Sequence, residues 1–247
     1  MQRTGKLIVI EGADGSGKTT QVRLLAERLG WAGIPCLTTA EPTRAPDPVG
    51  GLIRTALTGG VTIRDPRAMQ LLYAADRLEH AAAVIEPALR RGELVICDRY
   101  DLSTLVYMCA GTPEGRCACG WSGDVEMHSV THGIRFALCG ACGEACSWEQ
   151  LEVAAWLRDV GKWAPRPDAT IVLDVPHESA AARRGHRGGE PELFEKAAFQ
   201  DRCCKLYGQA SRLLPCGDRV FYVDASRSAE DVSRTVFELV SEIWRTN

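Results

Sequence analysis

Residues 8–20 read IVIEGADGSGKTT, and they predict a strand, a tight loop and a helix in succession. The β-branched run at 8–10 is typical of a buried strand. The segment behind it has the form G-x-x-x-x-G-K-T, from Gly12 to Thr19. Leucines at helical spacing come next, so the glycine-rich loop joins a strand to a helix. That context indicates a phosphate-binding P-loop rather than a chance glycine turn.

The residue types of this loop suit a nucleotide phosphate. Glycines let the backbone curl with its N–H groups pointing inward, and the N-terminus of the next helix adds positive potential. Lys18 supplies a cation for the β- and γ-phosphates, and the Thr19 hydroxyl is expected to hold Mg²⁺. The predicted nucleotide-binding residues are Gly12, Ala13, Asp14, Gly15, Ser16, Gly17, Lys18, Thr19 and Thr20.

The composition limits the class of protein. A chain of 247 residues, 45% of them hydrophobic, is long enough for one large domain or for one domain with an insertion. Its net charge of −3 gives no basic field for nucleic acid or an anionic membrane, so neither is an expected partner. No apolar run approaches the length of a membrane span, and no signal peptide precedes the first strand. We therefore expect a cytoplasmic enzyme.

Strand and helix patterns alternate along most of the chain, which predicts an α/β fold of the P-loop NTPase type. Its parallel five-stranded sheet would be flanked by helices, with ligands at the carboxyl ends of the strands. Asp98 and Arg99 fall at one such end. The expected strands are 7–11, 34–38, 94–98, 170–175 and 219–223, and the expected helices are 16–30, 67–91, 193–214 and 229–244.

A cysteine-rich segment interrupts this alternation. We therefore divide the chain into a nucleotide-binding core at 1–108 and 148–247 and a small metal-binding insertion at 109–147. Without a secretion signal, clustered cysteines favour metal over disulfides. Two knuckle-like pairs predict a structural Zn²⁺ on four thiolates, with an iron–sulfur cluster, redox thiols or a simple loop as alternatives. The predicted ligands are Cys117, Cys119, Cys139 and Cys142, with Cys109, Cys146, His128 and His132 as rivals.

Other residues must position the group that receives the phosphate. Tyr73 and Arg77 share a helix face, so they either stack on and bond a base or form a half-buried tyrosine beside a solvated arginine. Arg99 could clamp a phosphate, and Asp98 could accept from a metal-bound water; the alternative is a surface ion pair. A glycine-rich segment with Arg183, Arg184 and Arg187 is either a closing lid or a solvated loop.

Several motifs in this order resemble those of the thymidylate kinases, over nearly all of the chain except the cysteine-rich segment. They are EGADGSGKTT, EPT with a downstream GLIR, LLYAADR, DRYDLST, PDATIVLDV and an arginine-rich lid before a long helix. The resemblance implies that Asp14 contacts the acceptor's 3′-hydroxyl and that Tyr73 stacks on thymine. It likewise implies that Arg77 reaches a base oxygen, and that Arg99, assisted by Arg54, holds the acceptor phosphate.

The catalytic arginine is expected in the lid, as Arg183 or Arg187, because the P-loop contains none. Three positions depart from the family pattern. Met108 replaces a polar amide near the base, Ala40 replaces an arginine before the EP pair, and Leu193 replaces a lid arginine.

Together these features predict an ATP:dTMP phosphotransferase. Lys18, Arg99, Arg183 and Arg187 are the predicted catalytic residues, ATP and Mg²⁺ the expected donor and metal, and a homodimer the assembly that the resemblance implies. The acceptor site is expected to comprise Asp14, Arg54, Tyr73, Arg77, Asp98 and Arg99. The alternatives are a kinase for another monophosphate such as dUMP, a zinc-ribbon nucleic-acid-binding NTPase, and a catalytically silent ATP sensor.

Overall fold

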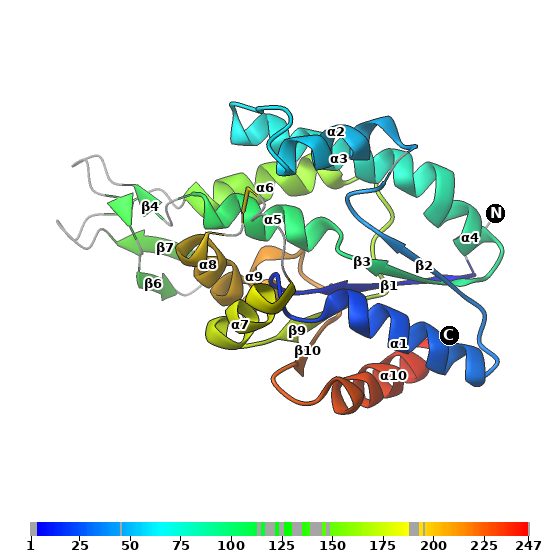
Figure 1. The fold of residues 1–247 in the computed structure, drawn as a ribbon. Coiled ribbons are helices and arrows are strands. Elements are labelled where there is room, and N and C mark those ends of the chain that lie inside the picture. The colour runs from blue at the N-terminus through cyan, green and yellow to red at the C-terminus, as the bar shows by residue number, and fades with distance from the viewer. Residues whose placement is uncertain are drawn as a thin grey trace.

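Five parallel strands form the centre of the fold, in the order β10-β9-β1-β3-β2 (Figure 1). The predicted five-stranded parallel sheet is therefore confirmed. The second strand begins two residues later than expected, directly after Pro35, which has no N–H to donate to a ladder. The strands are β1 (Lys6–Glu11), β2 (Cys36–Ala40), β3 (Leu94–Asp98), β9 (Ala169–Asp174) and β10 (Val220–Asp224).

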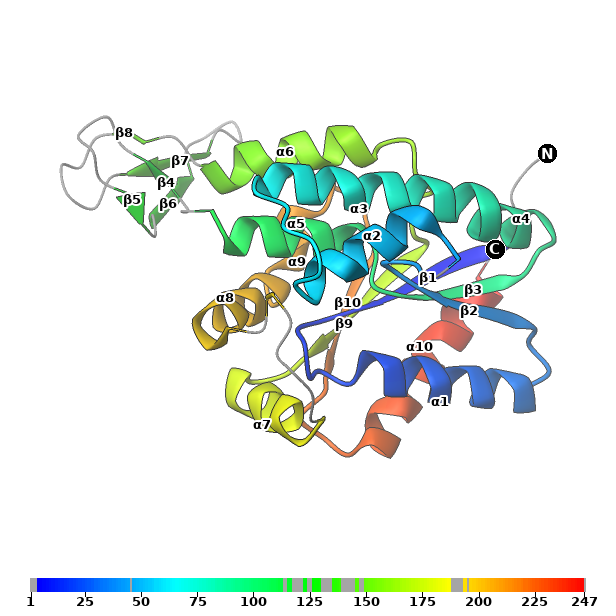
Figure 2. The ribbon, with the colours of Figure 1, turned by 45° about the horizontal axis from the view of Figure 1, so that its top comes forward.

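Helices cover both faces of this sheet (Figures 1 and 2). Ile8 and Ile10 of β1 pack toward α1 and α10, whereas Leu7 and Val9 pack toward α4 on the other face, because successive strand residues point to opposite sides. Both faces are thus buried, which explains the continuous apolar runs in the sequence. The helices are α1 (Lys18–Trp31), α2 (Pro48–Leu57), α3 (Pro66–His80), the π-helical turn η1 (Ala81–Ile85), α4 (Glu86–Arg90), α5 (Asp101–Ala110), α6 (Glu149–Gly161), α7 (His177–Arg187), α8 (Ala197–Tyr207), α9 (Ala210–Leu213) and α10 (Ala229–Arg245).

Three predicted segments differ in detail. The expected helix at 67–91 is continuous but changes to a π turn at η1, just before Pro87, which has no N–H for the carbonyl four residues earlier. The expected helix at 193–214 divides into α8 and α9 at Gly208. The predicted arginine lid is helical as far as Arg187, so that part of it is a helix and not a loop.

Five short strands lie between α5 and α6 and form two small antiparallel sheets, β4-β5 and β6-β7-β8 (Figure 2). They are β4 (Gly115–Arg116), β5 (Ser122–Gly123), β6 (Glu126–Ser129), β7 (Arg135–Leu138) and β8 (Ala145–Cys146). The computed structural model describes residues 4–44, 46–112, 115–116, 122–123, 126–129, 135–138, 145–146, 149–187, 193–194 and 196–246, so the four predicted zinc ligands lie outside the described residues.

The topology places a ligand cleft between β1 and β3. The chain leaves β1 toward β2 on one side and leaves β3 toward β9 on the other, so the direction of winding switches between these neighbours. Ligands bind at such switch points, outside the carboxyl ends of the strands. The P-loop follows β1, and Arg99 follows β3. None of the helices in the described part of the chain combines the length and hydropathy needed to cross a bilayer.

Candidate active site

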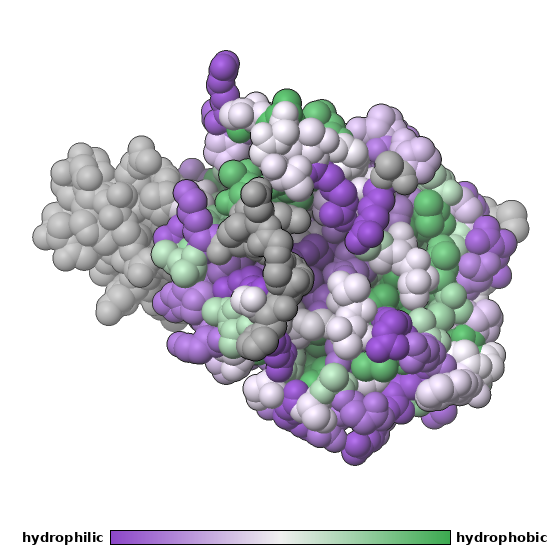
Figure 3. Space-filling model, viewed as in Figure 1, coloured by the Kyte–Doolittle hydropathy of each residue, from purple (hydrophilic) through white to green (hydrophobic). Residues whose placement is uncertain are grey.

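A pocket of about 500 Å³ opens where β1 and β3 end. In the space-filling view it is the hollow near the middle of the face, with mostly hydrophilic residues around it (Figure 3). The P-loop, α2, α3, α5 and α7 all contribute to its wall. It brings together the predicted site residues Asp14, Gly15, Gly17, Lys18, Thr19, Thr20, Arg54, Tyr73, Arg77, Asp98, Arg99 and Arg183.

The P-loop backbone has the conformation that its glycines were expected to allow. Gly15 has a φ of +89°, and a Cβ there would lie 2.3 Å from the carbonyl oxygen of Ala180. Gly17 has a φ of +97°, and a Cβ there would meet no atom within 4 Å, because the loop faces the open pocket. The loop therefore needs glycine for close packing at one position and for left-handed backbone at both.

Lys18 is buried at the floor of this loop. Its Nζ donates hydrogen bonds of 2.9 Å to the carbonyl oxygens of Gly12 and Ala13. Burial, together with the positive charge of Arg99, lowers the pKa of Lys18 to about 8, although nearby carboxylates oppose the shift. An anion in the pocket would replace the weak carbonyl partners and favour the charged amine.

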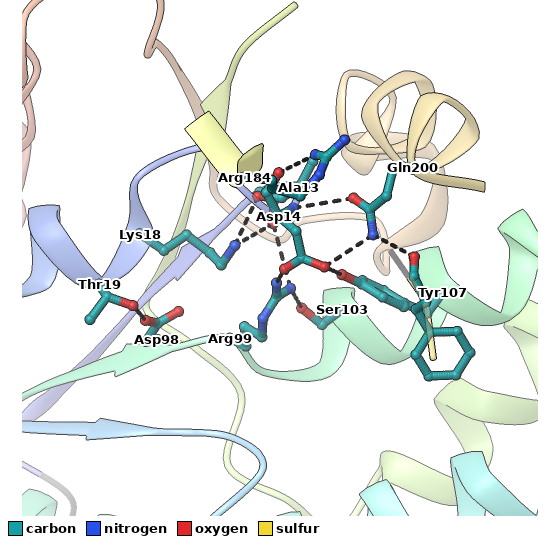
Figure 4. A network of polar contacts seen from close by, with 12 residues as sticks. Ala13, Asp14, Lys18, Thr19, Asp98, Arg99, Ser103, Tyr107, Arg184 and Gln200 are labelled. Carbon is teal, nitrogen blue, oxygen red and sulfur yellow. Dashed lines mark hydrogen bonds and ion pairs between the residues drawn. The ribbon is translucent and has the colours of Figure 1, made fainter. Parts of the chain in front are cut away.

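Thr19 and Asp98 face each other across the end of β3. The Thr19 hydroxyl donates to Asp98 Oδ2 at 2.8 Å (Figure 4). Hydroxyl and carboxylate oxygens are hard ligands of the kind that Mg²⁺ prefers, so this pair fits the expected metal. Nearby, the buried Ser16 hydroxyl oxygen has no hydrogen-bond partner within the described chain, which leaves a polar group available to a ligand of the loop.

Arg99 occupies a strained position at the acceptor side of the pocket. Its φ is +71°, which is unfavourable for a residue with a Cβ, and it forms an ion pair with Asp14. Its Nη1 donates to the hydroxyls of Ser103 at 3.0 Å and Tyr207 at 3.2 Å. Strain of this kind persists only where surrounding contacts hold it, as these do.

Asp14 connects the P-loop to the opposite wall (Figure 4). Besides its ion pair with Arg99, its Oδ2 accepts hydrogen bonds from the Tyr107 hydroxyl at 2.8 Å and from Gln200 Nε2 at 3.0 Å. Its main-chain oxygen accepts from Arg184 on α7. One residue thus touches α5, α7 and α8.

The α3 residues line the pocket beside this network. Arg77 is only 3% exposed, so the alternative of a solvated arginine is wrong. Its Nε donates to Glu41 at 2.9 Å and its Nη2 to Thr104 at 2.8 Å, an arrangement that fixes the guanidinium next to Tyr73. Arg54 approaches from α2 and donates to the Pro42 carbonyl at 3.0 Å, while its buried Nε has no partner within the described chain.

The α7 arginines divide between two roles. Arg183 lines the pocket and donates to the Ala225 carbonyl at 2.9 Å, whereas Arg184 contacts Asp14. Arg187 lies on α7, but its side chain is outside the described residues. Met108 is buried in the apolar cluster of α5, α6 and α8 and does not line the pocket.

Sequence reasoning missed several residues that shape the site. Glu11 is fully buried, and its Oε2 accepts from the Ser103 hydroxyl at 2.6 Å and the Tyr207 hydroxyl at 3.3 Å. Gln200 and Tyr107 contact Asp14. A carboxylate at the end of an otherwise apolar strand was the available signal for Glu11; Gln200 and Tyr207 sit among helical residues with no such signal.

A further polar group adjoins the pocket at Glu41. Glu41, His80 and Cys97 bring possible metal-ligand atoms within 4.8 Å of one another. His80 already uses both ring nitrogens, at 3.2 Å from Glu41 and 2.6 Å from the Thr39 hydroxyl. Glu41 also accepts from Arg77, and the Cys97 thiol donates to the Arg99 carbonyl, so each of the three side chains already has a hydrogen-bond partner.

A P-loop that faces an arginine and an aromatic ring across one pocket is the arrangement of a P-loop nucleotide kinase. The family model "Thymidylate kinase" matches residues 10–125. The thymidylate kinase of Thermomicrobium roseum is 36% identical over 240 residues, covering 96% of this chain and 95% of that protein. The thymidylate kinase of Pelotomaculum thermopropionicum is 32% identical over 243 residues, covering 97% and 94%.

The structure of thymidylate kinase from Candida albicans superposes with a TM-score of 0.70 at 26% identity, covering 98% of this chain and 93% of that one. This protein belongs to the thymidylate kinase family.

Proposed function

We propose that this protein transfers the γ-phosphate of ATP to dTMP and releases dTDP and ADP. The observation that carries the proposal is the ion pair between Asp14 and Arg99, which joins the P-loop to the acceptor side of a single pocket. Two anionic nucleotides can therefore meet end to end between Lys18 and Arg99.

The donor half of the reaction uses the P-loop. Backbone N–H groups of residues 12–17 would surround the β-phosphate, and Lys18 would exchange its two carbonyl partners for phosphate oxygens. Thr19 and Asp98 would hold Mg²⁺ directly or through water. When bound, Mg²⁺ neutralises the charge that develops between the β- and γ-phosphates.

The acceptor half uses α2, α3 and the end of β3. Tyr73 offers a flat face for the base, and Arg77 is held beside it by Glu41. Arg99 and Arg54 direct cationic groups into the same pocket for the acceptor phosphate. The acceptor phosphate oxygen is the nucleophile, so the chain needs no nucleophilic side chain of its own.

Charge stabilisation comes from α7. Arg183 lines the pocket, and it would exchange the Ala225 carbonyl for the transferring group; Arg187 on the same helix is the second candidate. Positioning and electrostatic stabilisation supply nearly all the rate of phosphoryl transfer.

An acceptor panel tests this function. Purified protein is incubated with Mg-ATP and dTMP, dUMP, dCMP, dGMP or AMP, and ADP release is followed for each, with Lys18→Ala as the inactive control. We expect dTMP to give the highest kcat/KM. Preference for dUMP would support the alternative acceptor, and ADP release that needs DNA instead of a monophosphate would support the nucleic-acid-binding NTPase.

The cysteine-rich segment is proposed to hold a structural Zn²⁺ on Cys117, Cys119, Cys139 and Cys142 and to shape the pocket wall or a contact between the two subunits of a homodimer. In support, α5 carries Ser103, Thr104 and Tyr107 to the pocket and then leads directly into this segment. Cys109 lies on α5 and is buried in an apolar cluster, so it belongs to the folded core. The test therefore replaces only residues 113–147 with a short linker and compares acceptor choice and assembly state with those of the full chain. Unchanged acceptor choice and assembly state would contradict the proposal.

A further inference from the structure

Gln70 is a polar side chain of the acceptor pocket whose amide oxygen has no partner in the described part of the chain. It lies on α3, lines the pocket, and is 3% exposed. Its Oε1 is buried and has no hydrogen-bond partner in the described part of the chain. Buried amide oxygens are nearly always paired in native proteins, so an orphan at a binding site points to a ligand as the missing partner.

The position of Gln70 relates it to the base. Gln70, Tyr73 and Arg77 stand three and four residues apart on α3, so they share one face of the helix and all three line the pocket. A rise of about 1.5 Å per residue puts Gln70 about one turn before Tyr73. A base stacked on the Tyr73 ring is therefore within reach of the Gln70 amide.

Arg77 and Thr104, the polar groups beside Gln70, can donate hydrogen bonds to a base, but the base also needs an acceptor. Arg77 is a pure donor, and the Thr104 hydroxyl oxygen already accepts from it at 2.8 Å, which frees the hydroxyl hydrogen to donate. Both groups suit carbonyl oxygens on a pyrimidine. A thymine or uracil ring also carries an N3–H donor between its two carbonyls, and that donor needs an acceptor.

We propose that Gln70 is a specificity-determining residue whose side-chain carbonyl accepts a hydrogen bond from N3–H of the acceptor base. This inference rests on the proposed dTMP kinase activity. No hydrogen bond from a described residue fixes Oε1 in its present orientation. A half-turn of the amide exchanges the oxygen and nitrogen positions, so the group can turn toward the bound ring.

The test compares Gln70→Leu and Gln70→Met with the wild-type protein on two substrates, dTMP and dCMP, whose ring nitrogen N3 carries no hydrogen. Wild-type protein is expected to favour dTMP, and both variants are expected to reduce this preference by about tenfold, because they remove the acceptor for N3–H. The KM for dTMP should rise about tenfold in each variant, while kcat and the KM for ATP change by less than about threefold.

Gln21→Leu is the matched control. Gln21 is also 3% exposed, and its Oε1 also has no partner among the described residues. It lies on α1, donates to the Ala229 carbonyl at 3.0 Å, and is not among the residues that line the pocket. It should leave both the KM for dTMP and the preference for dTMP unchanged. Calorimetric binding of dTMP without ATP gives a second readout that does not depend on turnover.

Two results would overturn the role of Gln70. One is a wild-type KM for dTMP in both variants, and the other is an unchanged preference between dTMP and dCMP. Either result with normal dTMP turnover leaves the proposed function standing. A wild-type protein that phosphorylates a different monophosphate and not dTMP would instead remove the proposed function and this inference together.

Discussion

Glu11 Oε1 lies 2.8 Å from the backbone nitrogen of Tyr100 and accepts its hydrogen bond. The same oxygen accepts the N–H of Ser103 at 3.0 Å. Tyr100 is the N-cap residue of α5 and makes no capping hydrogen bond with its own side chain. A carboxylate from β1 therefore caps the helix that begins beside Arg99, satisfying the two donors that a capping box would satisfy from within the helix.

Glu11→Gln should lower the stability of the protein, although the two side chains have nearly the same shape. The Gln amide replaces one acceptor with a donor that would face the Ser103 and Tyr207 hydroxyls, and the negative charge opposite Arg99 disappears. We expect the free energy of unfolding to fall by about 2 kcal/mol, measured by urea denaturation. Glu230→Gln, at an exposed carboxylate, is the control; a loss for Glu11→Gln no larger than that of the control would contradict the capping role.

ATP binding should take up a proton above pH 8. In the empty pocket the pKa of Lys18 is about 8, below its usual value, because burial and Arg99 disfavour the charged amine. Bound phosphates raise this pKa, so the affinity for ATP should fall as the pH rises above 8 and the free protein loses the proton. The expected slope approaches tenfold per pH unit.

Isothermal titration at pH 8.5 in two buffers of different ionisation enthalpy measures this uptake directly. Lys18→Met, which has no titrating amine, should show weaker binding and no such uptake. Equal heats for the wild-type protein in both buffers would show that Lys18 is already charged before ATP binds.

Arg99→Ala and Arg99→Gly should separate function from stability. Both remove the cation that faces the acceptor phosphate, so turnover should fall by at least about a thousandfold in each. Only glycine relaxes the backbone at a φ of +71°, so Arg99→Gly should be more stable than Arg99→Ala by about 1 kcal/mol.

Activity assays and thermal unfolding of the two Arg99 variants, beside Lys18→Ala, check this expectation. Lys18→Ala should also be inactive and folded. Near-normal turnover in any of the three variants would contradict the assigned roles, and equal stability of the two Arg99 variants would contradict the strain.

Purified protein should contain about one zinc ion per chain, since four thiolates close one tetrahedral site. Cys117→Ser and Cys139→Ser should each lower the metal content measured by mass spectrometry. Cys216→Ser is the control, because Cys216 is exposed and free. Full zinc content in both the Cys117→Ser and the Cys139→Ser variant would exclude these cysteines as zinc ligands. Bound iron in place of zinc would favour an iron–sulfur cluster.

The sequence predicted the sheet well, because its strands are buried on both faces and therefore appear as apolar runs. The predictions at β1 and β3 were accurate to within about one residue. Breaks within helices were harder to foresee. The π turn before Pro87 and the division at Gly208 leave the apolar spacing on either side nearly intact, so periodicity alone does not reveal them.

Part of the candidate site could likewise be predicted from the sequence, and part could not. Local motifs pointed to Lys18, Thr19, Asp98 and Arg99, which line the pocket, because each lies at or near the end of a strand. The partners of Asp14 could not be found this way. Gln200 contacts it from a sequence distance of 186 residues, and only the packing of α8 over the P-loop brings the two together.

Asp14 belongs to the donor loop through its backbone and to the acceptor wall through its side chain. The same short loop therefore bears on the binding of both substrates. A substitution in it that changes the affinity for one substrate will also change the affinity for the other. Acceptor preference can diverge more freely on α3, which lies outside the P-loop and contributes Gln70, Tyr73 and Arg77 to the pocket. Natural or directed evolution toward a new nucleobase should accordingly proceed through that helix while the loop stays constant.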